Sequence, residues 1–189
     1  MLGPVDLIHT LVNQEDFRST TFHLAGTSDY LLVDFDVFIA GRGSTFSEGD
    51  EIERPLVIFD RGGVIQYQSP KDNAALQERG QRLQELKDTV AQYSRLDKYL
   101  KRGEFLEAFG YYHKWLLTPL IEVLRMKYTP LHPDYAIVHI SRHFPPEILI
   151  QLEDLFKVNS VAEIGIKSLE ALRFFHEISV SNDIDQQSR

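Results

Sequence analysis

The sequence predicts an α+β fold in which a small sheet-containing unit precedes an antiparallel helical bundle. Short apolar runs separated by glycine-containing turns fill residues 1–68, a pattern typical of strands joined by hairpins. Residues 69–178 instead carry apolar side chains at helical spacing, with helix start and stop signals between them. We therefore expect an α/β unit at 1–68, a helical bundle at 69–178 and a polar tail at 179–189 that frays.

The first unit is expected to hold a helix followed by strands. Residues 5–14 place apolar side chains at helical spacing, which predicts a short amphipathic helix. Residues 20–24 and 30–40 predict two strands joined by a hairpin loop at 25–29. The second of these strands has apolar residues on both faces, so we expect it at the centre of the sheet.

The remainder of this unit is predicted to be a loop and a second hairpin. Residues 41–54 are polar and contain three glycines, which indicates a mobile surface loop. Residues 55–60 predict a short buried strand. Gly62 and Gly63 then turn the chain into a further strand at 64–67.

The helical part is marked by capping signals. Ser69, Pro70 and Asp72 supply a capping hydroxyl, a proline in the first turn and an early acid, and the helical pattern then continues to about residue 101. Gly103 is the expected stop. Residues 104–128 predict a second helix with a broad apolar face, which Pro119 should kink.

Two further helices complete the predicted bundle. Pro145 and Pro146 open a helix that runs to about residue 157. Ser160 and Glu163 form a capping box that opens a helix to about residue 178.

The composition is that of a globular protein. The 189 residues are 43% hydrophobic and 25% charged, and none is cysteine, which excludes disulfides, thiol nucleophiles and thiolate metal sites. No apolar run is long enough to span a membrane, and the first residues lack the basic and apolar regions of a signal peptide. We therefore expect a cytoplasmic protein without a membrane partner.

The net charge of −8 is concentrated in the first unit. Residues 1–70 hold 11 acidic and 4 basic residues, whereas residues 71–189 hold 17 acidic and 16 basic residues. Nucleic-acid binding requires a basic face. The acidity therefore disfavours a nucleic-acid partner and is compatible with a divalent metal or a cationic substrate.

Asp34 and Asp36 are the first candidate for chemistry. They lie two residues apart on a predicted strand, so both carboxylates should share one face of the sheet. In a buried strand, ionised carboxylates need a cation, and magnesium prefers oxygen ligands. The alternative is that one of them faces solvent or pairs with Arg18, Arg42 or Arg54.

The histidines at 132, 139 and 143 form the second candidate. His139 and His143 would share a helix face, and zinc sites use such spacing. No acid or cysteine in the neighbouring sequence completes a ligand set, and Pro145 ends any helix early. We therefore interpret these histidines as structural or surface residues.

Six stretches, taken in order, resemble the aminoglycoside (kanamycin) nucleotidyltransferase-like group. Those in the first unit resemble the second half of a minimal nucleotidyltransferase domain, and those in the helical part resemble the C-terminal bundle of the same proteins. The stretches are FRST (17–20), LVDFDV (32–37), RPLVIFDRGGV (54–64), LRMKYTP (124–130), HISRHFPPE (139–147) and LFKVNS (155–160). The resemblance covers most of residues 5–178 and depends on the order of the stretches, since no single motif is diagnostic.

The resemblance implies transfer of a nucleoside monophosphate from a nucleotide triphosphate to a small-molecule hydroxyl. In such enzymes a Gly-Ser turn precedes a D-x-D pair, and a third aspartate lies on a later strand. The three carboxylates hold two magnesium ions. On this basis Asp34 matches the third aspartate, with Asp36 as the alternate.

The sequence departs from this family in its first residues. No Gly-Ser turn, and no strand before residue 16 that could carry the D-x-D pair, is found. Unless the chain is a shortened version of a longer protein, we therefore expect a nucleotidyltransferase-like protein that is incomplete and inactive alone. Its missing part was either lost or is supplied by a complementing chain. The shortened sheet and the apolar face of residues 105–124 predict a homodimer. The alternative function is a non-catalytic oligomerisation or interaction module.

Overall fold

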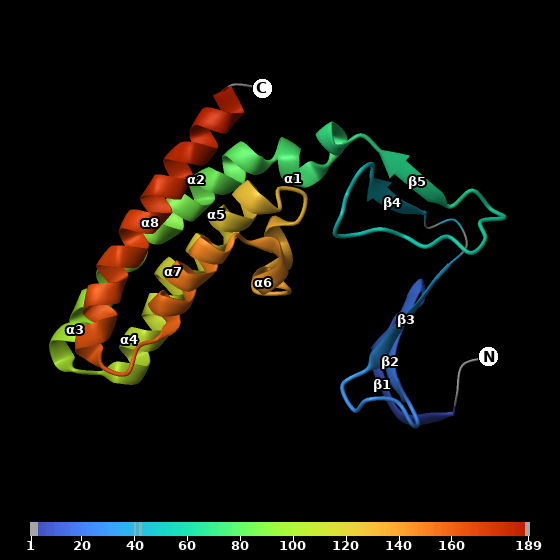
Figure 1. The fold of residues 1–189 in the computed structure, drawn as a ribbon, viewed down its shortest axis with the longest axis horizontal. Coiled ribbons are helices and arrows are strands. Elements are labelled where there is room, and N and C mark those ends of the chain that lie inside the picture. The colour runs from blue at the N-terminus through green and yellow to red at the C-terminus, as the bar shows by residue number, and fades with distance from the viewer. Residues whose placement is uncertain (1–3, 40, 42, 188–189) are drawn as a thin grey trace. The chain divides into compact units, whose positions relative to one another are not determined.

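The computed structural model describes residues 4–39, 41 and 43–187 (Figure 1). The chain divides into two compact units with interleaved sequences. The sheet unit comprises Met1–Phe46 and Glu51–Tyr67, and the helical unit comprises Ser47–Asp50 and Gln68–Arg189. The fold is mixed, with a small antiparallel sheet, a further strand pair and several helices. Among the described helices, none is both long enough and apolar enough to cross a membrane.

The strands form two small sheets. A three-stranded antiparallel sheet has the order β1-β2-β3, and a separate pair joins β4 to β5. Their bounds are β1 Val5–Asn13, β2 Phe17–Leu24, β3 Leu32–Phe38, β4 Ser44–Ser47 and β5 Ile65–Gln68. The hairpin loop predicted at 25–29 does lie between two antiparallel strands.

The predicted N-terminal helix is wrong, because residues 5–13 form β1. The register of β1 against β2 shifts between Val5 and Leu7 and again between Thr10 and Val12. Each irregularity changes which face the following residues occupy, so the apolar residues lose the period of two. Their spacing then resembles that of a helix.

The strand expected at the sheet centre is instead an edge. In the described sheet β3 pairs with β2 alone, and most of its side chains are exposed, including Phe35 at 57%. Apolar residues on both faces of a strand therefore do not imply burial here. The central strand is β2, whose buried residues are Ser19, Thr21 and His23.

The segment between the two sheets also differs from the prediction. The loop predicted at 41–54 contains β4 and the buried Asp50. Residues 55–60, predicted as a buried strand, form no strand, and Leu56 is 89% exposed. The Asp60 carboxylate accepts hydrogen bonds from the Val64 and Ile65 amides, both at 3.0 Å. This turn leads into β5, which pairs with β4 rather than with 55–60.

The helical unit is built from short helical segments and one long helix. Their bounds are η1 Pro70–Asp72, α1 Ala74–Gln77, α2 Arg79–Val90, η2 Ala91–Leu96, α3 Asp97–Arg102, α4 Phe105–Tyr112, η3 His113–Leu117, α5 Thr118–Tyr128, η4 Pro133–Tyr135, α6 Ile140–His143, α7 Pro146–Phe156 and α8 Val161–Gln187. Within this unit α8 packs along α5 and contacts α2 and α4 (Figure 1).

The predicted helix at 69–101 is divided into several segments. Its start is confirmed, since the Ser69 side chain accepts a hydrogen bond from the Lys71 amide. Asn73 then caps a new segment by accepting from the Ala75 amide at 2.9 Å. Gly103, with φ of 71°, ends α3 in the left-handed conformation that glycine adopts readily.

The second predicted helix contains a π turn instead of a simple kink. Residues 113–117 are π-helical, and the Thr118 amide bonds to the His113 carbonyl. Pro119 follows immediately and has no amide hydrogen for a helical bond. The wider turn accommodates this missing donor within a continuous helical path.

The C-terminal helices begin as predicted, but the last one is longer. The Glu163 amide bonds to Ser160 Oγ, and the Glu163 carboxylate accepts from the Asn159 amide. The predicted fraying tail is wrong within the described residues, because α8 continues to Gln187. Asn182 is fully buried and its amide donates to the Val123 carbonyl, which holds the last turns in place.

The core of the helical unit consists of apolar side chains contributed by most of its helices. Leu116, Leu120 and Val123, which belong to the apolar face of residues 105–124, are at most 1% exposed. The helical unit itself covers this part of the face. This part of the face therefore gives no support for the predicted homodimer.

Candidate functional site

Asp34 and Asp36 lie side by side on one face of the edge strand β3. Asp34 is opposite Thr21, and Asp36 is opposite Ser19, across the β2–β3 pairing. Alternation along each strand puts these four side chains on the same face. The sheet therefore presents two carboxylates and two hydroxyls together.

The two carboxylates are solvated, contrary to the premise of the sequence argument. Both aspartates are exposed, whereas Thr21 and Ser19, which lie opposite them on β2, are buried, with 8% and 9% of their surface exposed. Thr21 Oγ1 donates a hydrogen bond to Asp34 Oδ1 at 2.6 Å. Water can thus stabilise the charges, and no cation is required to keep the carboxylates ionised.

Arg18, one of the arginines expected as a partner, does not lie on the same face of the sheet as these carboxylates. Arg18 is opposite Val37, so it alternates with Ser19 and lies on the other face of the sheet. Arg42 lies outside the described residues. The described part of β2 therefore places no arginine beside the carboxylates.

His23 occupies the same face and forms a hydrogen-bonded pair with Asp6. Its Nδ1 lies 2.6 Å from Asp6 Oδ1, and its Nε2 lies 3.0 Å from the Ser28 carbonyl oxygen. Both ring nitrogens face acceptors, which favours the doubly protonated imidazolium. The hydrogen bond to Asp6, followed by the bond to Ser28, raises the pKa of His23 above its usual value.

The histidines of the helical unit are dispersed among different partners. His132 is buried, and its Nε2 lies 2.6 Å from Oδ2 of the buried Asp50. His143 Nδ1 accepts a hydrogen bond from the Arg125 guanidinium at 2.8 Å. The rings of His139 and His143 lie 6.3 Å apart. The structure thus pairs His132 with an acid that is distant from it in the sequence.

Burial and the adjacent arginine keep His143 neutral. Desolvation lowers the pKa of His143, and the positive charge of Arg125 lowers it further. The neutral ring is also the form that can accept a hydrogen bond at Nδ1. His143 is therefore a structural acceptor, which agrees with the sequence interpretation.

No family model, curated protein or solved structure matches this chain. The chemistry of the site therefore rests on its own geometry.

Sequence reasoning identified the aspartate pair but missed the polar groups around it. Thr21 and Ser19 could have been found from the hairpin register, since β2 and β3 are adjacent along the chain. The Asp6–His23 pair could not, because the apolar spacing of residues 5–14 predicts a helix rather than a strand. Asp50 and His132 are separated by 82 residues, and no local pattern links them.

Proposed function

We propose that this chain is a nucleotidyltransferase-like protein that binds a divalent cation weakly and does not transfer a nucleotidyl group alone. Asp34 is the proposed third carboxylate, with Asp36 as the alternate. The observation that carries the proposal is that Asp34 and Asp36 share one face of the sheet, each opposite a hydroxyl side chain of β2, Thr21 or Ser19. The helical unit would correspond to the C-terminal bundle of that group.

The donor set fits magnesium. Carboxylate and hydroxyl oxygens are hard ligands, and magnesium commonly retains several waters when two carboxylates bind it. When bound, magnesium would neutralise phosphate charge on a nucleotide triphosphate. Within the chain, Thr21 orients Asp34 by occupying one of its oxygens and leaving the other open.

The same donor set argues against independent catalysis. Transfer by two metal ions requires carboxylates that clamp both ions around the reacting phosphate. On this face Asp6, the nearest further acid along the sheet, is engaged by His23. A complementing chain that supplies additional carboxylates would be needed for turnover.

Paramagnetic manganese provides the test of the cation site. Titration of the full chain with Mn²⁺ should broaden the amide signals of residues 19–21 and 34–36 first. Asp34→Asn combined with Asp36→Asn should abolish this broadening, and Glu107→Gln, an exposed acid on α4, should leave it unchanged. Broadening centred elsewhere would refute the site.

A turnover assay tests the second half of the proposal. The purified chain should release no pyrophosphate from a nucleoside triphosphate and magnesium in the presence of an aminoglycoside acceptor. Release that depends on magnesium and disappears in Asp34→Asn would contradict the proposal of an inactive chain.

Exposed apolar side chains favour the alternative function of an interaction module. On the face opposite the carboxylates, Ile8 is 63% and Phe35 is 57% exposed, and Ile58 in the following segment is 85% exposed. Such surfaces are typical of association sites. The proposed partner is a second copy of the chain, with a complementing chain as the other candidate.

Sedimentation distinguishes the two functions. A homodimer that dissociates in the double variant Phe35→Ser and Ile58→Ser would support the interaction module. A monomer that still binds manganese at residues 34–36 would leave only the first function.

A further inference from the structure

The helical unit contains two open pockets that share two lining residues and are together called the cleft; neither is lined by a residue of the carboxylate face. One part, of about 270 Å³, is lined by residues that include His113, Thr118, Glu122 and Asp134. A larger part, of about 400 Å³, is lined mainly by apolar side chains, including Ile140, Leu149 and Leu152. Both parts are also lined by Ile137 and Phe156. The cleft therefore has a polar end and an apolar end that meet at these two side chains.

The π turn aligns two polar residues at one end of this cleft. In an α-helix residue 117 would stack over residue 113, because hydrogen bonds join residues four apart. Here the bond from the Thr118 amide to the His113 carbonyl joins residues five apart. Thr118 therefore follows His113 on the same side, and both line the cleft.

His113 offers a neutral ring with hydrogen-bonding capacity. Its ring packs against Phe109 at 4.4 Å and Phe156 at 5.2 Å between centroids. Burial lowers the pKa of His113 below its usual value. Among the described residues, no hydrogen bond to its ring nitrogens is seen, so the ring can donate or accept toward a ligand.

A buried arginine stabilises the loop that forms another part of the cleft lining. Arg125 is fully buried and donates from Nε to the Ala136 carbonyl at 2.9 Å and from Nη2 to the Val138 carbonyl. These carbonyls flank Ile137, which is 63% exposed and lines both parts of the cleft. Ala136 has φ of 45°, an unusual conformation for a residue other than glycine. Arg125 thus fixes a strained loop that presents Ile137 to the cleft.

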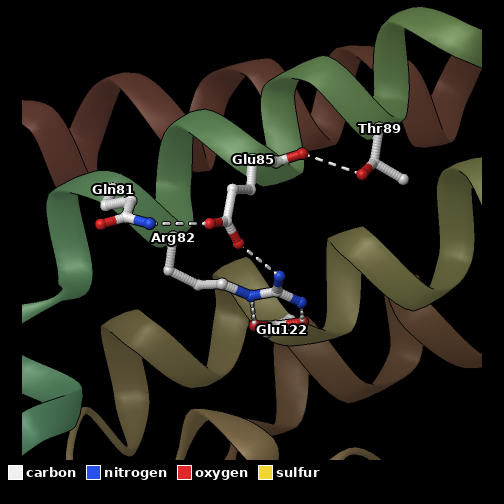
Figure 2. Close-up of polar contacts among 5 residues, drawn as sticks. All are labelled: Gln81, Arg82, Glu85, Thr89 and Glu122. Atoms are coloured by element: carbon white, nitrogen blue, oxygen red, sulfur yellow. Dashed lines mark hydrogen bonds and ion pairs between the residues drawn. The ribbon is translucent and has the colours of Figure 1, made fainter.

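The charged residues that line the polar end, Glu122 and Asp134, are both acidic. Arg82 extends from α2 to the Glu122 carboxylate on α5 (Figure 2). Its Nε lies 2.5 Å from Oε1, and its Nη2 lies 2.9 Å from Oε2. The same guanidinium also contacts Glu85 at 2.7 Å, so one positive charge faces two carboxylates. Asp134, an exposed residue of η4, adds a further negative charge to the lining.

The apolar end is electrically balanced. Its charged lining residues are Glu153 and Lys157, whose Oε2 and Nζ lie 3.6 Å apart. An anionic ligand would thus meet repulsion at one end and no net attraction at the other.

We propose that this cleft binds a small molecule with one cationic head and an apolar body. The head lies near Asp134 and Glu122, and the body packs against Ile137 and Phe156 in the larger part. This site is independent of the carboxylate face and of nucleotidyl transfer. Its chemistry differs from that of a polar polycation, because most of the lining is apolar.

A matched series of ligands tests this preference. The full chain, at about pH 7.5, is titrated with n-octylammonium, n-octanol and octanoate, and binding is followed by amide chemical shifts. We expect n-octylammonium to bind about tenfold more tightly than octanoate, with n-octanol between them. The largest shifts should fall on residues 113, 118, 137 and 156. Equal or tighter binding of octanoate, absence of binding of all three, or shifts centred elsewhere would overturn the proposal.

Exposed positions provide variants that should retain the fold. Ile137→Ser should weaken n-octylammonium and n-octanol by a similar factor, roughly fivefold or more, because it removes apolar contact. Asp134→Asn should weaken n-octylammonium and leave n-octanol unchanged. Ile150→Ser, an exposed substitution on α7 at a residue that does not line the cleft, is the control. Equal effects of Ile150→Ser and Ile137→Ser would refute the assignment.

Discussion

The helical unit and the sheet unit bury opposite kinds of side chain. In the helical unit, Leu120 and Phe175 are at most 1% exposed and belong to a continuous apolar core. In the sheet unit, the central strand buries Thr21 and His23, while Phe35 on the neighbouring strand is 57% exposed. The two units of one chain therefore distribute their apolar residues in opposite ways.

This difference separates two sources of stability. Apolar burial is the dominant favourable contribution to folding, and the helical unit obtains it from its own residues. The described part of the sheet unit depends more on strand pairing and on polar contacts such as His23 with Asp6. Its apolar side chains are then available for association with another molecule.

Truncation of one phenylalanine in each unit should give the largest contrast. Phe175→Ala should lower the free energy of unfolding by about 3–5 kcal/mol, because it leaves a cavity in the core. Phe35→Ala should change it by less than about 1 kcal/mol, since the ring is mostly exposed. Urea denaturation measures both values. A comparable loss for Phe35→Ala would show that another surface covers this face of the sheet.

Removal of the buried guanidinium should have the next largest effect. Arg125→Met keeps most of the side-chain volume but leaves the Ala136 and Val138 carbonyls without this donor, at a cost of about 2–3 kcal/mol. Hydrogen exchange should accelerate at residues 136–140. Arg18→Met, at an exposed position of the sheet unit, is the matched control and should change stability by less than about 0.5 kcal/mol. Similar losses for both variants would contradict the role assigned to Arg125.

Loss of the α8 cap should destabilise the helical unit alone. Ser160→Ala removes the acceptor for the Glu163 amide and should cost about 1 kcal/mol. Ser94→Ala, at an exposed serine of η2, serves as the control. Hydrogen exchange in β1, β2 and β3 should be unchanged in both variants. Faster exchange there would mean that the units unfold together.

A change of pH should alter the stability of the two units in opposite directions. This is the smallest of the expected effects on stability. The raised pKa of His23 stabilises the sheet unit fully below about pH 6.5, and this contribution is lost as the pH rises through the folded-state pKa. The lowered pKa of His143 stabilises the helical unit above about pH 6.5, and this contribution is lost as the pH falls.

Amide exchange between about pH 5.5 and 8, corrected for intrinsic rates, measures this opposition. Opening free energies should fall in the helical unit on acidification and fall in the sheet unit on alkalinisation. His143→Asn should reduce the first trend, to which the lowered pKa of His113 also contributes, and His23→Asn should remove the second. Parallel trends in both units would contradict the two protonation states.

The sequence predicted the helix boundaries well where a local signal exists. Ser69, Gly103 and Ser160 mark starts and stops through hydrogen bonds within a few residues, and Pro146 marks a start through its fixed φ. Each lies at or beside the corresponding boundary. The end of α8 was missed because its last turns are held by Asn182, whose partner Val123 is 59 residues away. Distant tertiary contacts leave no local pattern.

The sheet was predicted less well for two physical reasons. Register irregularities within β1 hid its period of two, so that Val5 and Ile8 suggested a helix. Hydrophobic composition suggested that β3 and residues 55–60 are buried, although burial depends on what packs against them. The prediction that Asp34 and Asp36 share one face of a strand is nevertheless correct, because it depends only on a strand conformation at these residues.

The interleaving of the two units has a consequence for the order of events during synthesis. Ser47–Asp50 belongs to the helical unit but is translated with the sheet unit. His132 leaves the ribosome 82 residues after Asp50, a delay of roughly 4–16 s at typical elongation rates. β1, β2 and β3 can pair during this interval, whereas Asp50 cannot reach its buried position until the segment containing His132 has emerged. The contact between Asp50 and His132 is therefore among the late steps of maturation, and a pulse of protease on nascent chains should cut near residue 50 until that step is complete.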